Sequence, residues 1–315
     1  MKNSRASAPG KIILFGEHAV VYGRPAIAVP VNDVQAVATL TEAEPGAGFR
    51  LIAPDLGRDE QLPDVSPDDP LGTMIGLTLD YLERPEIPDA ILTVRSTIPL
   101  GRGLGSGAAV STAIARAIGQ YFGRSLPPAV VSALVYDVEK LYHGTPSGID
   151  NTVVAFNQPV YFIKGRPIRR LRVAQPLTLV IADTGVVAPT HKVVGDLRRR
   201  WQADPAGHER FFDAIGGVVE KGRALIETPA AGIAELGALM NENQTILRTI
   251  GVSSPELDDL VEAARRAGAM GAKLSGAGWG GNMIALATTQ NAPAIAEALD
   301  KARAVNVIVT KVIDH

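Results

Sequence analysis

The sequence contains no cysteine among its 315 residues. This absence excludes disulfide bonds, thiolate nucleophiles and zinc–thiolate sites. An excess of one charge is also missing, because 31 basic residues stand against 33 acidic ones and the net charge is −2. The balance gives no general electrostatic reason to bind nucleic acid or an anionic membrane. We interpret the two basic clusters, residues 166–172 and 198–200, as solvated faces.

Long hydrophobic runs are missing as well. The first apolar run covers only residues 12–15, which is too short for a signal peptide, and no run approaches the ~20 apolar residues of a membrane span. We therefore expect a soluble, cytoplasmic protein. The hydrophobic content of 46% is that of an ordinary globular protein, and the length predicts two domains. We place them at residues 1–172 and 173–315, with the boundary following a Lys-Gly-Arg-Pro turn at residues 164–167.

The most informative segment is PLGRGLGSGAAV, residues 99–110. Its glycine-rich turn runs directly into an alanine-rich helical pattern. A helix N-terminus has unpaired N–H groups and a partial positive charge, and glycines let the backbone wrap closely around a phosphate. The spacing is not that of a Walker A motif, which needs a Lys and a Ser or Thr after its last Gly. The alternative is a turn that only packs a helix on a sheet.

Hydrophobic periodicity predicts strands mixed with helices along the whole chain. Strands are expected at residues 11–15, 26–31, 36–41, 90–98, 177–182, 282–287 and 305–312. Helices are expected at residues 71–82, 106–122, 127–143, 190–202, 208–226, 231–249, 255–267 and 292–304. Residues 45–70 and 273–281 are expected to be loops. The helix at 127–143 should end before Gly144 and bury Val131, Leu134, Val135, Val138 and Leu141.

Four glycine-rich or polar motifs follow one another along the chain. They are PGKIILFGEHAVVYG (9–23), GLGSGAAVS (103–111), GTPSGIDN (144–151) and KLSGAGWGG (273–281). Glycine costs backbone entropy on folding, and wrapping one large anionic ligand from several sides would be a reason for so many. The ordered set resembles the GHMP kinase superfamily of small-molecule kinases over nearly the whole chain. The first and third motifs are similar to those of the mevalonate kinase branch.

The resemblance implies an α+β fold with two domains, an N-terminal ATP-binding domain with the phosphate loop before a helix and a C-terminal ferredoxin-like domain. It implies a kinase that transfers phosphate from ATP to the 5-hydroxyl of (R)-mevalonate, with an active site between the two domains. It also implies Mg²⁺ as cofactor and a homodimer. The alternatives are phosphomevalonate kinase, a sugar kinase, diphosphomevalonate decarboxylase and a non-catalytic ligand sensor. The first and third motifs disfavour the decarboxylase, and the presence of Lys11, Glu139 and Asp150 disfavours the sensor.

Asp150 is the candidate general base, because a carboxylate in hydrogen-bond reach of the accepting hydroxyl can take its proton. The alternative is a helix capping box, whose spacing Ser147 and Asp150 also satisfy. Lys11 follows a Pro-Gly turn and begins a strand. The resemblance implies that it lies beside the aspartate, where its charge would stabilise a developing alkoxide. Its alternative is an exposed lysine at a strand edge.

The resemblance also implies the remaining site residues. Glu139 and Ser106 would hold Mg²⁺, although Gly107 stands where relatives have a second serine, so that Ser111 or water is an alternative ligand. Substrate binding is expected at Glu17, His18, Ser147 and Thr190, of which Thr190 is also a candidate helix N-cap. ATP binding is expected at Pro99, Gly101, Gly103, Leu104, Gly105, Ser106, Gly107, Ala108, Ser111, Gly276, Ala277 and Gly278.

Trp279 departs from the family pattern, in which glycine is usual at this place of the third loop. Its indole either narrows the pocket or points outward and packs.

Overall fold

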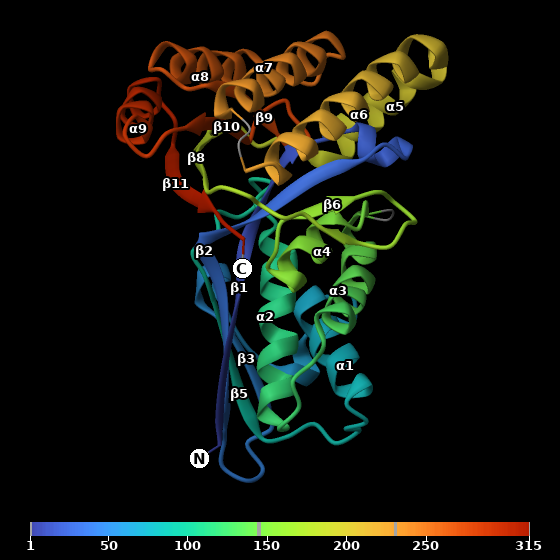
Figure 1. Cartoon of the computed structure of the whole chain (residues 1–315). Coiled ribbons are helices and arrows are strands. Elements are labelled where there is room, and N and C mark those ends of the chain that lie inside the picture. Colours follow the sequence, from blue (N-terminus) through green and yellow to red (C-terminus); the bar gives the residue numbers. More distant parts are fainter. Residues whose placement is uncertain (1, 144–145, 230–231, 315) are drawn as a thin grey trace. The chain divides into compact units, whose positions relative to one another are not determined.

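A computed structural model describes residues 2–143, 146–229 and 232–314 (Figure 1). They form two compact units, neither of which is continuous in sequence. The first unit takes its residues from Met1–Gly10, Val34–Leu100 and Leu104–Asn157, and the second from Lys11–Asp33, Gly101–Gly103 and Gln158–His315. Strands β1 (Asn3–Phe15) and β2 (Ala26–Glu42) contribute residues to both. The division of the sequence at residue 172 stays a prediction.

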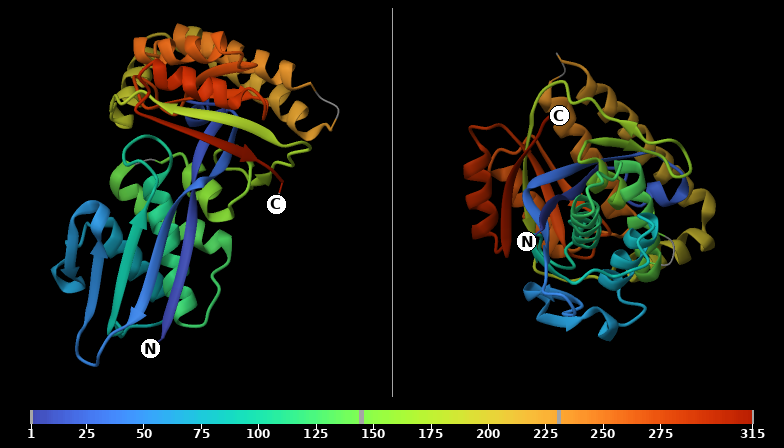
Figure 2. Two further views of the ribbon diagram at one scale, coloured as in Figure 1. Left: turned by 90° about the vertical axis from the view of Figure 1, so that its left-hand side faces the viewer. Right: turned by 90° about the horizontal axis from the view of Figure 1, so that it is seen from below.

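The first unit is a sheet with helices packed on one of its faces (Figure 2). Strands β4, β3, β5 and β2 are neighbours in that order, and β1 also pairs with β2. The β3–β5 pair is parallel, whereas β3–β4 and β2–β5 are antiparallel. The further strands are β3 (Phe49–Ala53), β4 (Arg58–Gln61) and β5 (Ala90–Ser96). The helices are α1 (Pro70–Tyr81), α2 (Ser106–Tyr121), α3 (Pro128–His143) and α4 (Ile149–Phe156).

The second unit is built on an antiparallel sheet with the order β11-β8-β10-β9. If these four strands are numbered 1 to 4 in chain order, their order across the sheet is 4-1-3-2, which is the arrangement of a ferredoxin-like β-α-β-β-α-β unit. The strands are β8 (Leu177–Asp183), β9 (Gly271–Ser275), β10 (Asn282–Ala287) and β11 (Asn306–Val312). Helices α7 (Ile233–Thr249), α8 (Pro255–Arg266) and α9 (Ala292–Lys301) pack on this sheet (Figure 1).

The remaining elements of the second unit connect this sheet to the rest of the chain. Helix α5 (Thr190–Ala203) packs on α6 (Pro205–Glu227), and α6 packs on α7. Strand β6 (Val160–Phe162) pairs with β2 and with the short β7 (Arg169–Arg170). Among the single 3-10 turns, η1 (Ala19–Tyr22) lies in this unit, whereas η2 (Pro54–Leu56) and η3 (Leu62–Asp64) lie in the first unit. Within the described ranges, no helix is both long and apolar enough to cross a bilayer.

The structure confirms the α+β fold and the expected helices, with ends shifted by a few residues. The loop expected at residues 45–70 is wrong, because β3 and β4 form there. Phe49, Leu51 and Ala53 alternate with outward-facing residues and are buried, and Arg50 forms an ion pair with Asp59 on the neighbouring strand, Nε to Oδ1 2.6 Å. The two strands expected at 26–31 and 36–41 are one continuous β2, and α4, β6 and β7 were not predicted.

The buried stripe of α3 is shorter than its periodicity predicts. Val131, Val135 and Val138 are buried, Leu134 is half-buried, and Leu141 is 52% exposed. Periodicity identifies the side chains that share a face, but it does not show how far the covering elements extend along the helix. Gly144, expected just past the helix, lies outside the described residues, as does Thr145 of the third motif.

Candidate functional site

The loop before α2 has the backbone geometry of an anion site. Gly101, Gly103 and Gly105 have φ values of 68°, 78° and 72°, which residues with a side chain rarely adopt. Gly105 is the N-cap of α2, and no side chain within the described ranges caps the helix. Leu104 is buried and anchors the loop, whereas a Cβ added at Gly107 would meet nothing within 4 Å. The N–H groups of this helix N-terminus therefore have no side-chain cap among the described residues, and such groups attract hydrogen-bond acceptors and anions.

The other expected nucleotide residues differ in exposure. Ala108 and Ser111 are buried within α2, and Ser106 is half-buried at its first position. Pro99 precedes the turn and is half-buried. Arg102 lies within the loop, and its Nε approaches Asp183 Oδ2 at 3.2 Å, while its backbone carbonyl accepts a hydrogen bond from Asn282 Nδ2. Residues 101–103 are thereby fixed to strands β8 and β10.

The third glycine loop is held against the Glu-His pair of the first motif. Gly276 and Gly278 have φ values of 92° and 87°, and a Cβ on Gly278 would lie 1.9 Å from the carbonyl oxygen of Val252. Only glycine fits there. Between them, the carbonyl oxygen of Ala277 lies 2.8 Å from Nε2 of His18. The structure thus brings together two motifs separated by about 260 positions.

His18 is a buried, neutral histidine. Burial lowers the pKa of His18 to about 4, so the imidazole is uncharged at neutral pH. A carbonyl oxygen can only accept, so Nε2 carries the hydrogen of the bond to Ala277. The other nitrogen, Nδ1, is then an acceptor. Such a histidine binds a hydroxyl group better than it binds a carboxylate.

Trp279 packs outward on the connection between α7 and α8. Its backbone N–H donates to Val252 O at 2.9 Å, and its indole Nε1 donates to Gly251 O at 2.9 Å. It does so at a φ of 56°, a strained value for a bulky residue.

Arg200, of the basic cluster at residues 198–200, donates from Nη1 to the carbonyl of Ile250, next to Gly251. The solvated-face interpretation is therefore wrong for Arg200, which is half-buried, while Arg198 and Arg199 are exposed.

Glu17 and Lys11 are both buried, with exposures of 1% and 4%. The interpretation of Lys11 as an exposed edge lysine is wrong. Oε1 of Glu17 forms an ion pair with Nζ of Lys273, which has no exposed surface and also donates to Leu274 O at 2.6 Å. Lys273 and Ser275 belong to strand β9 and not to the expected loop. Sequence reasoning missed Lys273, although a lysine in an otherwise apolar strand beside a glycine loop is a usable signal.

Asp150 lies in the first turn of α4. The N-cap of that helix is Gly148 at φ 88°, without a side-chain cap, so the capping box that would make Ser147 the N-cap is wrong. Ser147 Oγ instead accepts from Ile149 N at 3.3 Å. The next residue, Asn151, is buried and donates from Nδ2 to Ser132 Oγ on α3 at 2.9 Å. This bond fixes the rotation of α4 and with it the place of Asp150, and the sequence reasoning missed it.

The two expected metal ligands lie on neighbouring helices of the first unit. Ser106 begins α2 and Glu139 is half-buried on α3, and these helices pack together. The neighbours of Glu139, Asp137 and Lys140, are exposed and pair with each other, Nζ to Oδ1 2.6 Å. A carboxylate and a hydroxyl are hard oxygen ligands of the kind Mg²⁺ takes together with water and phosphate oxygens. Among the described residues, no cluster of three or more His, Asp or Glu side chains could hold a metal by itself.

Thr190 is the exposed first residue of α5, and the N-cap of that helix is Pro189. The N-cap interpretation of Thr190 is therefore wrong, and its expected contact with substrate stays a prediction.

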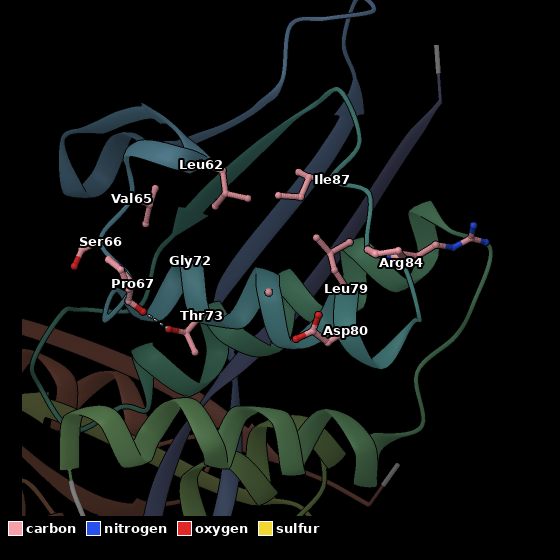
Figure 3. A pocket seen from close by; sticks show the side chains of 12 residues that line it. Leu62, Val65, Ser66, Pro67, Gly72, Thr73, Leu79, Asp80, Arg84 and Ile87 are labelled. Atoms are coloured by element: carbon pink, nitrogen blue, oxygen red, sulfur yellow. Dashed lines mark hydrogen bonds between the residues drawn. The ribbon is translucent and has the colours of Figure 1, made fainter.

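A pocket of about 320 Å³ lies in the first unit, between α1 and the segments that precede and follow this helix (Figure 3). Leu62, Val65, Leu79 and Ile87 give it an apolar lining, and Asp80 and Arg84 stand at its side (Figure 3). None of the site residues expected from the sequence lines it.

The fold and the glycine-rich motifs identify the class of protein to which this chain belongs. The family model "GHMP kinases N terminal domain" matches residues 74–158, and "GHMP kinases C terminal" matches residues 225–305. The chain belongs to the GHMP kinase family. Among its curated relatives, the mevalonate kinase of Thermococcus sibiricus is 37% identical over 90% of this chain and 88% of its own length. The mevalonate kinase of Pyrococcus furiosus is 35% identical with the same coverage.

Solved structures agree with this assignment. Mevalonate kinase of L. major in complex with R-mevalonate has a TM-score of 0.83 and 28% identity, covering 98% of this chain and 96% of its own. The Methanococcus jannaschii mevalonate kinase has a TM-score of 0.86 with 24% identity, covering 99% and 98%. The second likeness supports the fold alone.

Proposed function

We propose that this chain is a kinase that transfers the γ-phosphoryl group of ATP to the 5-hydroxyl of (R)-mevalonate, giving 5-phosphomevalonate and ADP. The observation that carries the proposal is the 37% identity to a mevalonate kinase over nine-tenths of the chain. The buried placement of Lys11, Glu17 and His18 supports it, because these are residues of the first motif.

Asp150 is the general base in this proposal. It takes the proton of the 5-hydroxyl as the oxygen attacks the γ-phosphorus. Its helix is fixed by Asn151 and Ser132, which keeps the carboxylate in one place. Lys11 supplies a positive charge from a buried strand and stabilises the negative charge that develops on the attacking oxygen.

His18, Glu17, Ser147 and Thr190 are the proposed substrate residues. The acceptor Nδ1 of His18 suits a hydroxyl of mevalonate, since a neutral imidazole offers a carboxylate no charge. Fixed contacts of this kind hold the substrate so that its 5-hydroxyl and the phosphate can align, which lowers the entropic part of the barrier.

The residues that we propose for nucleotide binding belong to the loop before α2 and to the third glycine loop. The N-terminus of α2 offers backbone N–H groups to the phosphates. Ser106 and Glu139 would hold Mg²⁺, which when bound neutralises charge on the β- and γ-phosphates. The open space beside Gly107 leaves room for a water in place of the second serine hydroxyl.

The test is an assay of ADP release with mevalonate, phosphomevalonate and a panel of sugars as acceptors. We expect release with mevalonate alone and a product phosphorylated at the 5-oxygen. Release only with another acceptor would replace mevalonate as the substrate. Release with none of them would favour a ligand sensor. A cytoplasmic location and a homodimer remain our predictions, to be checked by cell fractionation and by light scattering.

A further inference from the structure

Glu17, His18 and Ala19 form a strained turn just after β1. The backbone N–H of Ala19 donates to the carbonyl of Glu17 at 2.7 Å, and His18 lies between them at φ 62° and ψ −51°. These angles lie close to those of a γ-turn with positive φ, which is rare and persists only where the surroundings hold the residue in it. One holding contact is the hydrogen bond from the imidazole of His18 to Ala277 O. The chain after His18 supplies the others.

The 3-10 turn η1 follows the γ-turn directly and is joined to it by backbone hydrogen bonds. The N–H of Val21 donates to the carbonyl of His18 at 3.0 Å. The N–H of Arg24 donates to the carbonyl of Ala19 at 3.1 Å. A displacement of η1 therefore also displaces the backbone of His18.

The last residue of η1, Tyr22, packs on aromatic side chains of α5 and α6. Its ring stacks on that of the buried Phe212, with ring centroids 4.1 Å apart and an interplanar angle of 14°. The ring of Trp201 is tilted against Tyr22 with centroids 5.2 Å apart. Trp201 is itself fixed, because its Nε1 donates to Oε1 of Glu209 at 2.9 Å. The end of η1 is thereby packed on both helices.

Arg24 joins η1 to α6 through all three nitrogens of its guanidinium group. Nη1 donates to the carbonyl of Tyr22 at 2.8 Å. Nε and Nη2 donate to Oδ1 of Asp213 at 3.0 and 2.8 Å, and Nη2 also forms an ion pair with Glu209. The stem of Arg24 lies on Gly216 of α6, where an added Cβ would be 3.3 Å from Cγ of the arginine. Only arginine has a planar group that can bind one carbonyl oxygen and two carboxylates at once.

We infer that Arg24 is a positioning residue for the reaction, because it fixes η1 on α6 and so keeps His18 in its strained turn, where Nδ1 can accept a hydrogen bond from the substrate. The role rests on the proposed function, in which His18 binds a hydroxyl of mevalonate. The side chains of Glu209 and Asp213 are 34% and 68% exposed. Ion pairs this accessible contribute little to the free energy of unfolding, so their effect is on geometry.

The first test follows His18 in the free protein. Arg24→Met keeps the stem over Gly216 and removes the donors of the guanidinium group. His18 should then leave its buried place more often, so its pKa should rise from about 4 towards the ordinary 6.5. NMR of the imidazole resonances from about pH 8 to about pH 5 measures this change, and His18→Gln assigns them. The positive charges of Arg200 and Lys273, which also act on His18, are the same in parent and variant.

The second test is kinetic. Arg24→Met should raise the KM for mevalonate about fivefold, which corresponds to the loss of one net hydrogen bond. The kcat and the KM for ATP should stay close to those of the parent. The third glycine loop keeps its own hydrogen bonds, from Trp279 to Val252 and to Gly251.

Arg58→Met is the matched control. Arg58 also binds two carboxylates, those of Glu60 and Asp69, and its side chain is 22% exposed against 24% for Arg24. The control should change neither the titration of His18 nor the KM for mevalonate.

A parental KM for mevalonate or a parental titration of His18 in Arg24→Met would overturn the role, because both effects depend on His18. Equal changes in Arg58→Met would also overturn it, since the loss would then be a general loosening of the protein. If Arg24→Met does not fold, the double variant Glu209→Gln/Asp213→Asn removes both carboxylates on α6 and should show the same two changes. Parental values there would again overturn the role.

The failure of this role and the failure of the proposed function are distinguishable. A parent that releases no ADP with mevalonate would overturn the proposed function, and with it a role of Arg24 in that reaction. The titration of His18 needs neither substrate, so it shows separately whether Arg24 holds the turn.

Discussion

His18 and Ala277 are 259 positions apart in the sequence, and one hydrogen bond of 2.8 Å joins the imidazole Nε2 of the first to the carbonyl of the second. The bond ties the proposed substrate-binding histidine to the loop proposed to bind nucleotide. It also fixes which nitrogen of His18 carries the hydrogen, and so which substrate group the histidine can bind.

The buried state of His18 predicts a pH dependence of stability. Its pKa is about 4 in the folded protein and about 6.5 when unfolded, so the unfolded chain binds the extra proton between these values. Folding is therefore favoured less as the pH falls from 6.5 to 4, by about 3 kcal/mol in total. His18→Gln should reduce this slope in urea titrations at a series of pH values. His191→Gln, at an exposed histidine, is the control, and an unchanged slope for His18→Gln would contradict the prediction.

Asp150→Asn should preserve ATP binding and lower turnover by roughly two to four orders of magnitude, because the shape is kept while the proton acceptor is lost. The measurement is kcat together with the dissociation constant of ATP. Asp137→Asn, at an exposed position on α3, should behave as the parent. Turnover within about tenfold of the parent would remove Asp150 from the role of base.

Glu139→Gln should raise the Mg²⁺ concentration that gives half-maximal rate. The substitution replaces a hard anionic ligand by a neutral amide, and a high Mg²⁺ concentration should partly restore the rate. The titration is run at saturating ATP and mevalonate, with Asp137→Asn again as the control from the same helix. If the Glu139 variant showed the same dependence of rate on Mg²⁺ concentration as the parent, Glu139 would not be a metal ligand.

Gly107→Ser should be tolerated and should lower the Mg²⁺ requirement or leave it unchanged. A Cβ meets nothing within 4 Å there, and the added hydroxyl stands at the position where the family resemblance implies a second serine. Gly103→Ser is the contrasting variant, because its φ of 78° strains any side chain and should disturb the loop. If Gly107→Ser instead raised the KM for ATP steeply with an unchanged Mg²⁺ profile, the backbone of Gly107 would lie against the phosphates.

Trp279→Gly should raise the KM for ATP about fivefold and leave kcat nearly unchanged. The variant loses the indole bond to Gly251, and one net hydrogen bond contributes about 1 kcal/mol to holding the loop. Trp279→Phe keeps the ring without the N–H and should show a similar loss. Trp201→Phe removes the indole that bonds to Glu209 on α6 and should leave the KM for ATP unchanged. Equal KM values for all three variants would show that the hydrogen bond from Trp279 to Gly251 does not affect nucleotide binding.

Much of the fold could be predicted because its signals are local. The helical spacing of α2 and the Pro and Gly residues around its neighbours depend on residues a few positions apart. The short strands β3 and β4 could not be predicted in the same way. Their segment is rich in Pro, Gly and Asp, and it becomes sheet because β5 supplies a pairing edge for β3.

For the candidate site too, the features that the sequence predicted are local, and those that it did not predict depend on distant parts of the chain. By itself the sequence determined the order of the motifs, the family, and the residue types that the chemistry needs, since these are properties of short segments. Only the tertiary structure decided that Lys11 is buried, that Glu17 is paired with Lys273, and that Trp279 packs on the turn after α7. The physical reason is that burial, and the charge a buried group can carry, depend on neighbours supplied by distant parts of the chain.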